Sequence, residues 1–223
     1  ILWHIMKIYS NYGINDFIIC AGYKQHVIKE FFADYCLHCS DVTFDFTKGG
    51  EMTVHNNVSE PWKVTVVDTG LHTMTGGRVK RLKNYIDGTF MLTYGDGVSD
   101  VNLEKLLETH RSSGKAATLT AVHPEGKYGM MDLDGNNVIA FREKDIRDVG
   151  WVNGGFMVVE PEVLDYIEDD RSVFEKDTLG ILAKENKLGA YRHKGFWYCM
   201  DTARDKEKLE AMWESGDARW KTW

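Results

Sequence analysis

Two aspartates are the residues of this sequence best placed to do chemistry. Asp96 lies between two glycines, the first of which directly follows the apolar run 90–94, and Asp201 follows the aromatic run 196–198 after two residues. Glycines beside a carboxylate let a phosphate or a metal ion approach the backbone closely. Because Mg²⁺ prefers one or two carboxylates together with substrate phosphates, the pair predicts a magnesium site.

Each aspartate also has a purely structural interpretation. Asp96 can be an ordinary turn residue. Asp201 can be the N-cap of a helix that is expected to begin at about 203. Spacing along the chain does not prove that the two side chains meet, so both interpretations stay open at this point.

A glycine-rich turn at 73–78 precedes a basic helical pattern. Thr75 is the expected N-cap of that helix, and exposed backbone amides in such a turn suit an anion or the edge of a base. The alternative is a simple capped helix start, with Lys80 and Arg81 forming a solvated face.

Three weaker signals lie elsewhere in the chain. Glu143 and Lys144 are adjacent, and such a pair can hold a sugar hydroxyl and a phosphate, although it is more often a surface feature. Cys36 and Cys39 flank Leu-His and resemble half of a zinc site, but no second pair follows at a suitable spacing, so unpaired thiols are expected. Hydrolase and P-loop functions find no support, because the chain has neither a Gly-x-Ser-x-Gly elbow nor a Walker-type loop.

The composition is that of an ordinary globular protein. The chain has 223 residues, of which 43% are hydrophobic and 27% charged, and its net charge is −7. This acidic balance argues against a general nucleic-acid binder, and no apolar run reaches the roughly 20 residues of a membrane helix. The 4 cysteines are too few for a disulfide framework, which favours a reducing cytoplasm.

The chain alternates between helical and strand patterns, as expected of an α/β fold. Helical patterns occupy 1–9, 27–32, 77–86, 103–110, 172–187 and 203–213, and Pro161 is expected to open another helix. Strand patterns occupy 16–22, 42–46, 52–54, 63–67, 90–94, 116–122, 138–141 and 155–159. We predict a mostly parallel central sheet with helices on both faces, a β-rich insertion and a helical tail at 203–223.

On the basis of these motifs, the whole chain resembles the sugar-1-phosphate nucleotidyltransferases, and most closely the bacterial glucose-1-phosphate cytidylyltransferases. The segments that carry the resemblance are 1–7, 61–62, 67–70, 75–78, 94–97, 153–156, 200–202 and 220–223. The resemblance implies a single Rossmann-like nucleotidyltransferase domain over 1–223. It also places the family's first strand and Gly-rich loop before Ile1.

The implied reaction converts CTP and α-D-glucose 1-phosphate to CDP-glucose and pyrophosphate, in the synthesis of dideoxy sugars for surface polysaccharides. By position, Asp96 and Asp201 correspond to catalytic ligands of Mg²⁺. Thr73 and Arg78 correspond to cytosine contacts, and Gly95 lies near the nucleotide.

The family's sugar-phosphate contacts also map onto this sequence. Glu143 and Lys144 match contacts to the sugar and its phosphate, Tyr128 and Gly129 lie beside the glucose, and Asn153 belongs to the same group. The family usually has proline after the Glu-Lys pair, whereas this chain has aspartate. The resemblance also implies a homo-oligomer with no nucleic-acid or membrane partner.

Other functions remain open beside this one. A transferase for UTP or dTTP is the nearest alternative, and a catalytically silent nucleotide-binding subunit is another, although silence would not require both aspartates. A metal-dependent glycosyltransferase would need an Asp-x-Asp strand end, and Asp96 is followed by Gly-Val instead.

Overall fold

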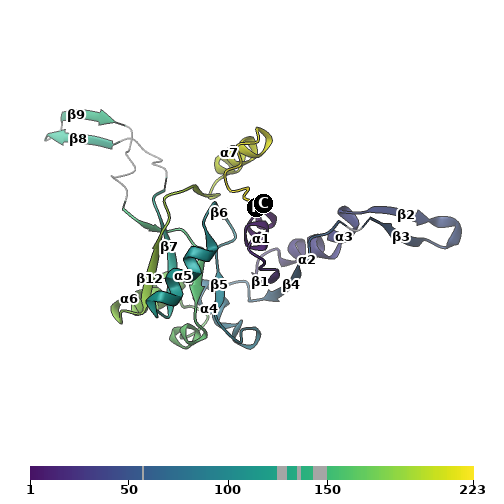
Figure 1. The fold of residues 1–223 in the computed structure, drawn as a ribbon, viewed down its shortest axis with the longest axis horizontal. Helices are drawn as coiled ribbons and strands as arrows, with labels where there is room; N and C mark the ends of the chain where they lie inside the picture. The colour runs from purple at the N-terminus through teal and green to yellow at the C-terminus, as the bar shows by residue number, and fades with distance from the viewer. Residues whose placement is uncertain (57, 125–129, 135–136, 143–149) are drawn as a thin grey trace. The chain divides into compact units, whose positions relative to one another are not determined.

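The computed structural model describes residues 1–56, 58–124, 130–134, 137–142 and 150–223 (Figure 1). The chain divides into two compact units. Unit 1 comprises Ile1–Gly13, Ile86–Tyr166 and Leu179–Trp223, and unit 2 comprises Ile14–Tyr85 and Ile167–Thr178. The single domain over 1–223 stays a prediction.

The central sheet of unit 1 is built around strand β7 (Ala117–Val122). Strand β12 (Leu188–Arg192) pairs with it in parallel, while β10 (Val152–Asn153) and β11 (Met157–Val159) pair with it antiparallel. Strand β5 (Phe90–Leu92) pairs antiparallel with β11. Strands β5, β7 and β12 therefore run in one direction, so their carboxyl ends share one edge of the sheet.

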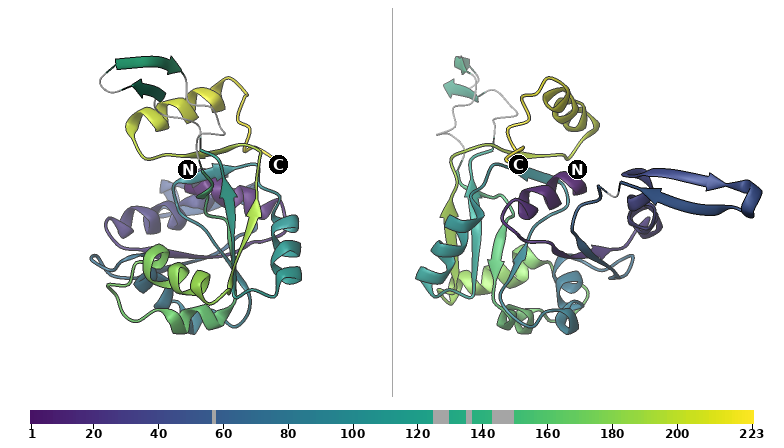
Figure 2. Two further views of the ribbon diagram at one scale, coloured as in Figure 1. Left: turned by 90° about the vertical axis from the view of Figure 1, so that its left-hand side faces the viewer. Right: turned by 45° about the vertical axis from the view of Figure 1, so that its right-hand side comes forward.

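In the described part of the chain, four α-helices accompany the sheet of unit 1. They are α1 (Leu2–Ser10), α5 (Leu103–Ser113), α6 (Leu179–Lys184) and α7 (Ala203–Glu214), and a 3₁₀ helix spans Pro161–Tyr166. Figure 2 shows α5 in teal beside the strands, and it contacts β7, β11 and β12. Among the described residues, no helix has the length and apolar character needed to cross a membrane.

The core of unit 1 forms where the apolar stripes of these helices meet the sheet. Side chains with less than 2% of their surface exposed include Ile8 of α1, Leu106 of α5, Val158 of β11 and Leu182 of α6. Burying such a side chain is worth about 1.5–3 kcal/mol. The core therefore fixes the sheet, and with it the residues that follow each strand.

Two further strand pairs belong to unit 1. Strands β6 (Gly97–Ser99) and β13 (Trp197–Cys199) pair antiparallel, with Cys199 opposite Gly97. Strands β8 (Met130–Asp134) and β9 (Asn137–Arg142) form a separate antiparallel hairpin.

Unit 2 is built on a parallel pair, β1 (Asp16–Ala21) with β4 (Lys63–Asp68). Helix α2 (Gln25–Ala33) contacts β4 and is followed by the short α3 (Tyr35–His38). Strands β2 (Asp41–Asp45) and β3 (Glu51–His55) then form an antiparallel hairpin, which is the predicted β-rich insertion (Figure 1). The remaining elements are α4 (Thr75–Lys80), 3₁₀ turns at Phe46–Lys48 and Lys83–Tyr85, and a π-type turn at Phe174–Thr178.

Several predicted elements differ in extent from the structure. The strand expected over 90–94 ends at Leu92. The basic helix expected over 77–86 ends at Lys80, and tighter i→i+3 bonds follow it, from Leu82 to Val79 and from Tyr85 to Leu82. The helical pattern at 172–187 divides into the π-type turn and α6.

A further difference lies in the strand expected over 155–159. It begins only at Met157, because Gly155 and Phe156 adopt positive φ angles of 74° and 44°. Such a conformation is rare for a bulky side chain and interrupts the strand ladder between β10 and β11.

Candidate active site

The pairing of β6 with β13 brings the two predicted catalytic aspartates together. Asp96 immediately precedes β6, and Asp201 follows β13 after one residue. Because the strands are antiparallel, the start of β6 meets the end of β13. The amide of Met200 donates to the carbonyl of Asp96 at 2.8 Å and closes this end of the ladder. Residues that are 105 positions apart are thus held at one point by backbone hydrogen bonds.

Asp96, Cys199 and Asp201 form a donor cluster of the kind that holds a divalent cation. One ligand atom from each residue lies within 4.8 Å of the others. Both aspartates are exposed and Cys199 is half-buried. The two carboxylates fit Mg²⁺, which accepts one or two protein carboxylates and completes its shell with water and phosphate oxygens.

The structure also excludes a capping role for Asp201. The N-cap of α7 is Thr202, whose hydroxyl accepts from the amide of Asp205, while the Asp205 carboxylate accepts from the amide of Thr202. This reciprocal pair is a capping box. Because Thr202 and Asp205 satisfy the helix start, the structural interpretation of Asp201 as an N-cap is wrong.

Sequence reasoning missed Cys199 as a member of this cluster. Its Sγ donates to Oδ1 of Asp201 at 3.2 Å. Partial burial, followed by the hydrogen bond to Asp201 and the negative charges of both aspartates, raises the pKa of the Cys199 thiol to about 12. A usable signal was present in the sequence, because residues i and i+2 of an extended segment point to the same face.

This protonated thiol gives a testable pH dependence. We expect the rate of Cys199 alkylation by iodoacetamide to rise about tenfold per pH unit up to at least pH 10, because only the thiolate reacts and an ordinary thiol titrates near 8.5. Mass spectrometry of tryptic peptides after timed labelling measures the rate at this cysteine. A rate that levels off near pH 9 would contradict the raised pKa.

The loop between β10 and β11 lies against the same edge. Asn153 donates through Nδ2 to the hydroxyl of Tyr94 at 3.0 Å and accepts from the amide of Gly155 at 3.0 Å. The indole of Trp197 donates to the carbonyl of Gly154 at 2.8 Å. Sequence reasoning gave Tyr94 no role of its own within the motif at 94–97, and its bond to Asn153 links the loop to the segment that carries Gly95 and Asp96.

Gly95 itself is exposed, and a Cβ at this position would meet no heavy atom within 4 Å. Its proximity to a nucleotide therefore stays a prediction.

Arg78 and Thr73, the predicted base contacts, belong to unit 2. Arg78 donates through Nη1 to the hydroxyl of Thr69 at 2.7 Å and to the carbonyl of Ala21 at 3.4 Å. These partners follow β4 and end β1, so the guanidinium lies at the carboxyl edge of the parallel pair, where open α/β sheets bind ligands. Thr73 is buried, with 8% of its surface exposed.

The turn at 73–78 differs from its prediction in two ways. Met74, and not Thr75, occupies the N-cap position of α4. The hydroxyl of Thr75 donates to Glu175 and accepts from the amide of Phe174. The amide of Gly76 donates to the carbonyl of Ser172 at 2.9 Å, so the expected open anion cradle is closed by the chain itself.

Four predicted sugar-phosphate contacts lie outside the described residues. They are Tyr128, Gly129, Glu143 and Lys144. The predicted unpaired thiols are confirmed, since Cys20, Cys36, Cys39 and Cys199 are all free. Among the described residues, Cys36 and Cys39 are not part of a metal-sized donor group.

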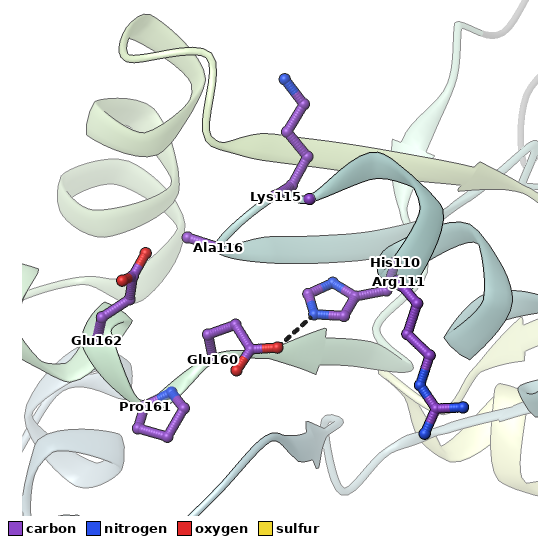
Figure 3. A pocket seen from close by; sticks show the side chains of 8 residues that line it. His110, Arg111, Lys115, Ala116, Glu160, Pro161 and Glu162 are labelled. Atoms are coloured by element: carbon purple, nitrogen blue, oxygen red, sulfur yellow. Dashed lines mark hydrogen bonds and ion pairs between the residues drawn. The ribbon is translucent and has the colours of Figure 1, made fainter.

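A separate cavity of about 430 Å³ lies at the opposite edge of the unit 1 sheet, beside the start of β7 and the end of β11 (Figure 3). His110 at its wall is buried, with Nδ1 at 3.0 Å from the Thr118 hydroxyl and Nε2 at 2.9 Å from Glu160. Glu160 also accepts from the hydroxyl of Thr89. Because these side chains satisfy one another's hydrogen bonds, we interpret them as a structural network and not as a binding site.

We expect Glu160→Gln to lower the free energy of unfolding by about 1 kcal/mol at neutral pH, a value discounted because the side chain is 35% exposed. The hydrogen bonds from His110 and then Thr89 lower the pKa of Glu160. A lowered folded pKa stabilises the protein above the ordinary glutamate pKa of about 4.3, and the contribution disappears as the pH falls through the lowered value.

Urea unfolding of the wild type and of Glu160→Gln at neutral and acidic pH measures this difference. Glu162→Gln on the exposed rim is the matched control and should change little. Equal stability of the Glu160→Gln variant and the wild type at neutral pH would contradict the network.

Comparisons with known proteins agree with this architecture. A family profile described as nucleotidyl transferase matches residues 1–214. The chain is 51% identical to the glucose-1-phosphate cytidylyltransferase of Salmonella typhi, over 100% of this chain and 87% of the relative. It is 42% identical to a probable glucose-1-phosphate cytidylyltransferase of Bacillus subtilis with the same coverage.

Solved structures resemble this one at lower sequence identity. HddC from Yersinia pseudotuberculosis matches 95% of this chain and 84% of its own, with a TM-score of 0.65 and 20% identity. A UDP-glucose pyrophosphorylase complexed with UDP-glucose matches 96% of this chain and 86% of its own, with a TM-score of 0.64 and 13% identity. These two likenesses concern the fold alone.

Proposed function

The chain belongs to the nucleotidyl transferase family, and we propose that it is a glucose-1-phosphate cytidylyltransferase that works through a metal held by Asp96 and Asp201. The enzyme forms CDP-glucose and pyrophosphate from CTP and α-D-glucose 1-phosphate. The observation that carries the proposed catalytic site is the convergence of the two aspartates, within 4.8 Å of each other, at the β6–β13 ladder.

The reaction needs little covalent chemistry from the protein. A phosphate oxygen of glucose 1-phosphate attacks the α-phosphorus of CTP, the bond from that phosphorus to its bridging oxygen breaks, and pyrophosphate leaves. The attacking oxygen is already ionised at neutral pH, so no general base is required. Catalysis is then a matter of positioning the two anions and neutralising their charge.

Asp96 and Asp201 are the residues that hold the divalent cation in this proposal. A Mg²⁺ ion held by these two carboxylates would neutralise phosphate charge and orient the triphosphate. Their positions are fixed without help from the ligand, because the β6–β13 ladder and the capping box of α7 set the backbone on both sides.

Arg78 and Thr73 supply the choice of base, and Gly95 lies near the nucleotide. Tyr128, Gly129, Glu143, Lys144 and Asn153 hold the glucose and its phosphate. Asn153 also stabilises the fold locally, because its side-chain amide forms hydrogen bonds with the Tyr94 hydroxyl and the Gly155 amide. Product CDP-glucose then enters the synthesis of dideoxy sugars for surface polysaccharides such as O-antigen.

We further propose that the enzyme is a cytoplasmic homo-oligomer. Its four thiols are free, as in a reducing compartment.

The apolar face of the β2–β3 hairpin supports the oligomer. The β2–β3 register puts Val42, Phe44, Met52 and Val54 on one face of the hairpin. Phe44 is 53% exposed and Met52 48% exposed. A two-stranded hairpin is marginally stable alone, so this apolar face suits contact with a second copy.

The oligomer is tested by light scattering after size-exclusion chromatography. Phe44→Glu is expected to lower the molar mass from that of the assembly to that of a smaller species. Thr43→Glu on the opposite face is the control and should leave the assembly unchanged. A monomeric wild type would contradict the proposal.

The proposed activity is tested by following pyrophosphate release from CTP, UTP, dTTP or GTP, each with glucose 1-phosphate. We expect release with CTP that requires both the sugar phosphate and Mg²⁺ and stops on addition of EDTA. Release with UTP or dTTP in preference to CTP would favour the alternative transferases. The absence of release with every nucleotide would favour a silent nucleotide-binding subunit.

A further inference from the structure

Cys199 occupies a position in the metal-binding cluster that the proposed reaction does not use. Its sulfur is the third ligand atom of the group with Asp96 and Asp201, all within 4.8 Å of one another. It already lies 3.2 Å from Oδ1 of Asp201. The same backbone ladder that fixes the aspartates fixes this sulfur, because Cys199 pairs with Gly97, the neighbour of Asp96.

These separations are close to those of ligands that share one ion. In a tetrahedral zinc site, a sulfur at about 2.3 Å and a carboxylate oxygen at about 2.1 Å from the metal lie about 3.6 Å apart. The 3.2 Å between Sγ of Cys199 and Oδ1 of Asp201 is near this value, and one ligand atom from each of the three residues lies within 4.8 Å of the others. Carboxylate oxygen and thiolate sulfur are both ligands of zinc-like cations, and three such side chains leave a fourth position open to water or phosphate.

The sulfur changes which cations the site accepts. Carboxylate oxygens suit Mg²⁺, whereas thiolate sulfur binds zinc-like cations far more strongly than magnesium. A site made of only the two aspartates would discriminate little between hard and soft cations. The added sulfur gives an advantage to soft cations alone.

We propose that Cys199 is a third metal ligand that opens the Asp96–Asp201 site to thiophilic divalent cations such as Cd²⁺ and Zn²⁺, in competition with Mg²⁺. The inference rests on the proposed function only in taking the two aspartates as the Mg²⁺ site. On binding, a sulfur–metal bond forms, the S–H bond breaks, and the proton passes to water.

The test is a titration with Cd²⁺, followed by the ultraviolet thiolate-to-cadmium charge-transfer absorption. The full-length protein carries Cys36→Ser and Cys39→Ser, because Cys36 lies on α3, Cys39 is the C-cap of that helix, and both thiols could bind cadmium when excess is added. We expect absorption that saturates at one equivalent. Cys199→Ser and Cys199→Ala should each abolish it, with circular dichroism confirming that both variants are folded.

The carboxylates and the competing cation are tested in the same protein. Asp96→Asn and Asp201→Asn should each weaken cadmium binding at least roughly tenfold, since even outer-shell partners are worth about 10–100-fold in metal affinity. Excess Mg²⁺ should raise the apparent dissociation constant for Cd²⁺. Asp87→Asn, an exposed aspartate before β5, is the control and should have no effect.

The inference is overturned if the absorption survives in either Cys199 variant, if both aspartate variants bind Cd²⁺ as tightly as the parent, or if Mg²⁺ does not compete. These results are distinct from a failure of the proposed function. An enzyme whose Mg²⁺-dependent turnover needs Asp96 and Asp201, but which shows no cadmium–sulfur absorption, keeps its function and loses only the role of Cys199.

Discussion

Replacing Asp96 or Asp201 by asparagine is expected to lower the turnover number for CDP-glucose formation by at least about a hundredfold. Each substitution removes a formal negative charge and a proposed metal ligand at the point where the two side chains meet, within 4.8 Å. Both side chains are exposed, so the fold should survive. Turnover is measured at a fixed CTP concentration over a range of Mg²⁺ concentrations.

The comparison with other substitutions makes this result specific. Asp87→Asn changes the same charge at the other end of β5 and should keep the wild-type turnover number. Thermal unfolding of every variant should stay close to that of the wild type. Wild-type rates for both Asp96→Asn and Asp201→Asn at limiting Mg²⁺ would remove the metal pair from the mechanism.

The second large effect is expected in the choice of base. Cytosine presents two adjacent acceptors, O2 and an unprotonated N3, whereas uracil carries a donor at N3. Arginine has five N–H donors and no acceptor. It can therefore donate to both acceptors of cytosine, whereas with uracil one of its N–H groups would face the N3–H donor. A buried mispaired donor costs about 1–3 kcal/mol, so kcat/KM for CTP should exceed that for UTP by roughly tenfold to a hundredfold.

Arg78→Ala should bring the two values of kcat/KM close together. Arg78→Lys should do the same in part, because lysine keeps the charge and loses the planar fork of donors. Arg78 also bonds Thr69 and Ala21, so thermal unfolding must be measured alongside. Arg81→Ala breaks a surface pair with Asp170 and is the control. An unchanged CTP-to-UTP ratio in folded Arg78→Ala would overturn the assignment.

The sequence singled out Asp96 and Asp201 as candidate catalytic residues, but it did not predict the strand pairing that brings them together. Glycines around Asp96 and aromatic residues before Asp201 marked both positions, and the family resemblance gave them a common role. Their convergence depends on the register of β6 with β13, which is a pairing between strands of three residues each. Strands this short carry too little periodicity to be recognised in advance.

The glycine-rich turn before α4 shows a different limit of prediction from sequence. Its composition predicted open amides for an anion, and the structure instead places Ser172 and Asp170 against it. A Cβ on Gly76 would lie 2.7 Å from the Ser172 carbonyl oxygen, so this glycine serves close packing of two chain segments. Long-range packing of this kind leaves the same local signature as a binding loop.

Cys199 shows a third limit. A single cysteine in an aromatic strand gives no pattern of its own, and the role proposed for Cys199 depends on its position two residues before Asp201 and opposite Gly97. Alternation along the strand could have placed its sulfur beside Asp201. That Asp96 lies in the same cluster could be learned only from the structure, because it depends on the pairing of β6 with β13.

The most direct test of the assigned reaction is the identity of its products. ³¹P nuclear magnetic resonance of the full-length enzyme with CTP, glucose 1-phosphate and Mg²⁺ should show CDP-glucose and pyrophosphate appearing in equal amounts as both substrates disappear. The formation of CMP or CDP without a sugar nucleotide, or no consumption of CTP under conditions in which the protein is folded, would contradict the account.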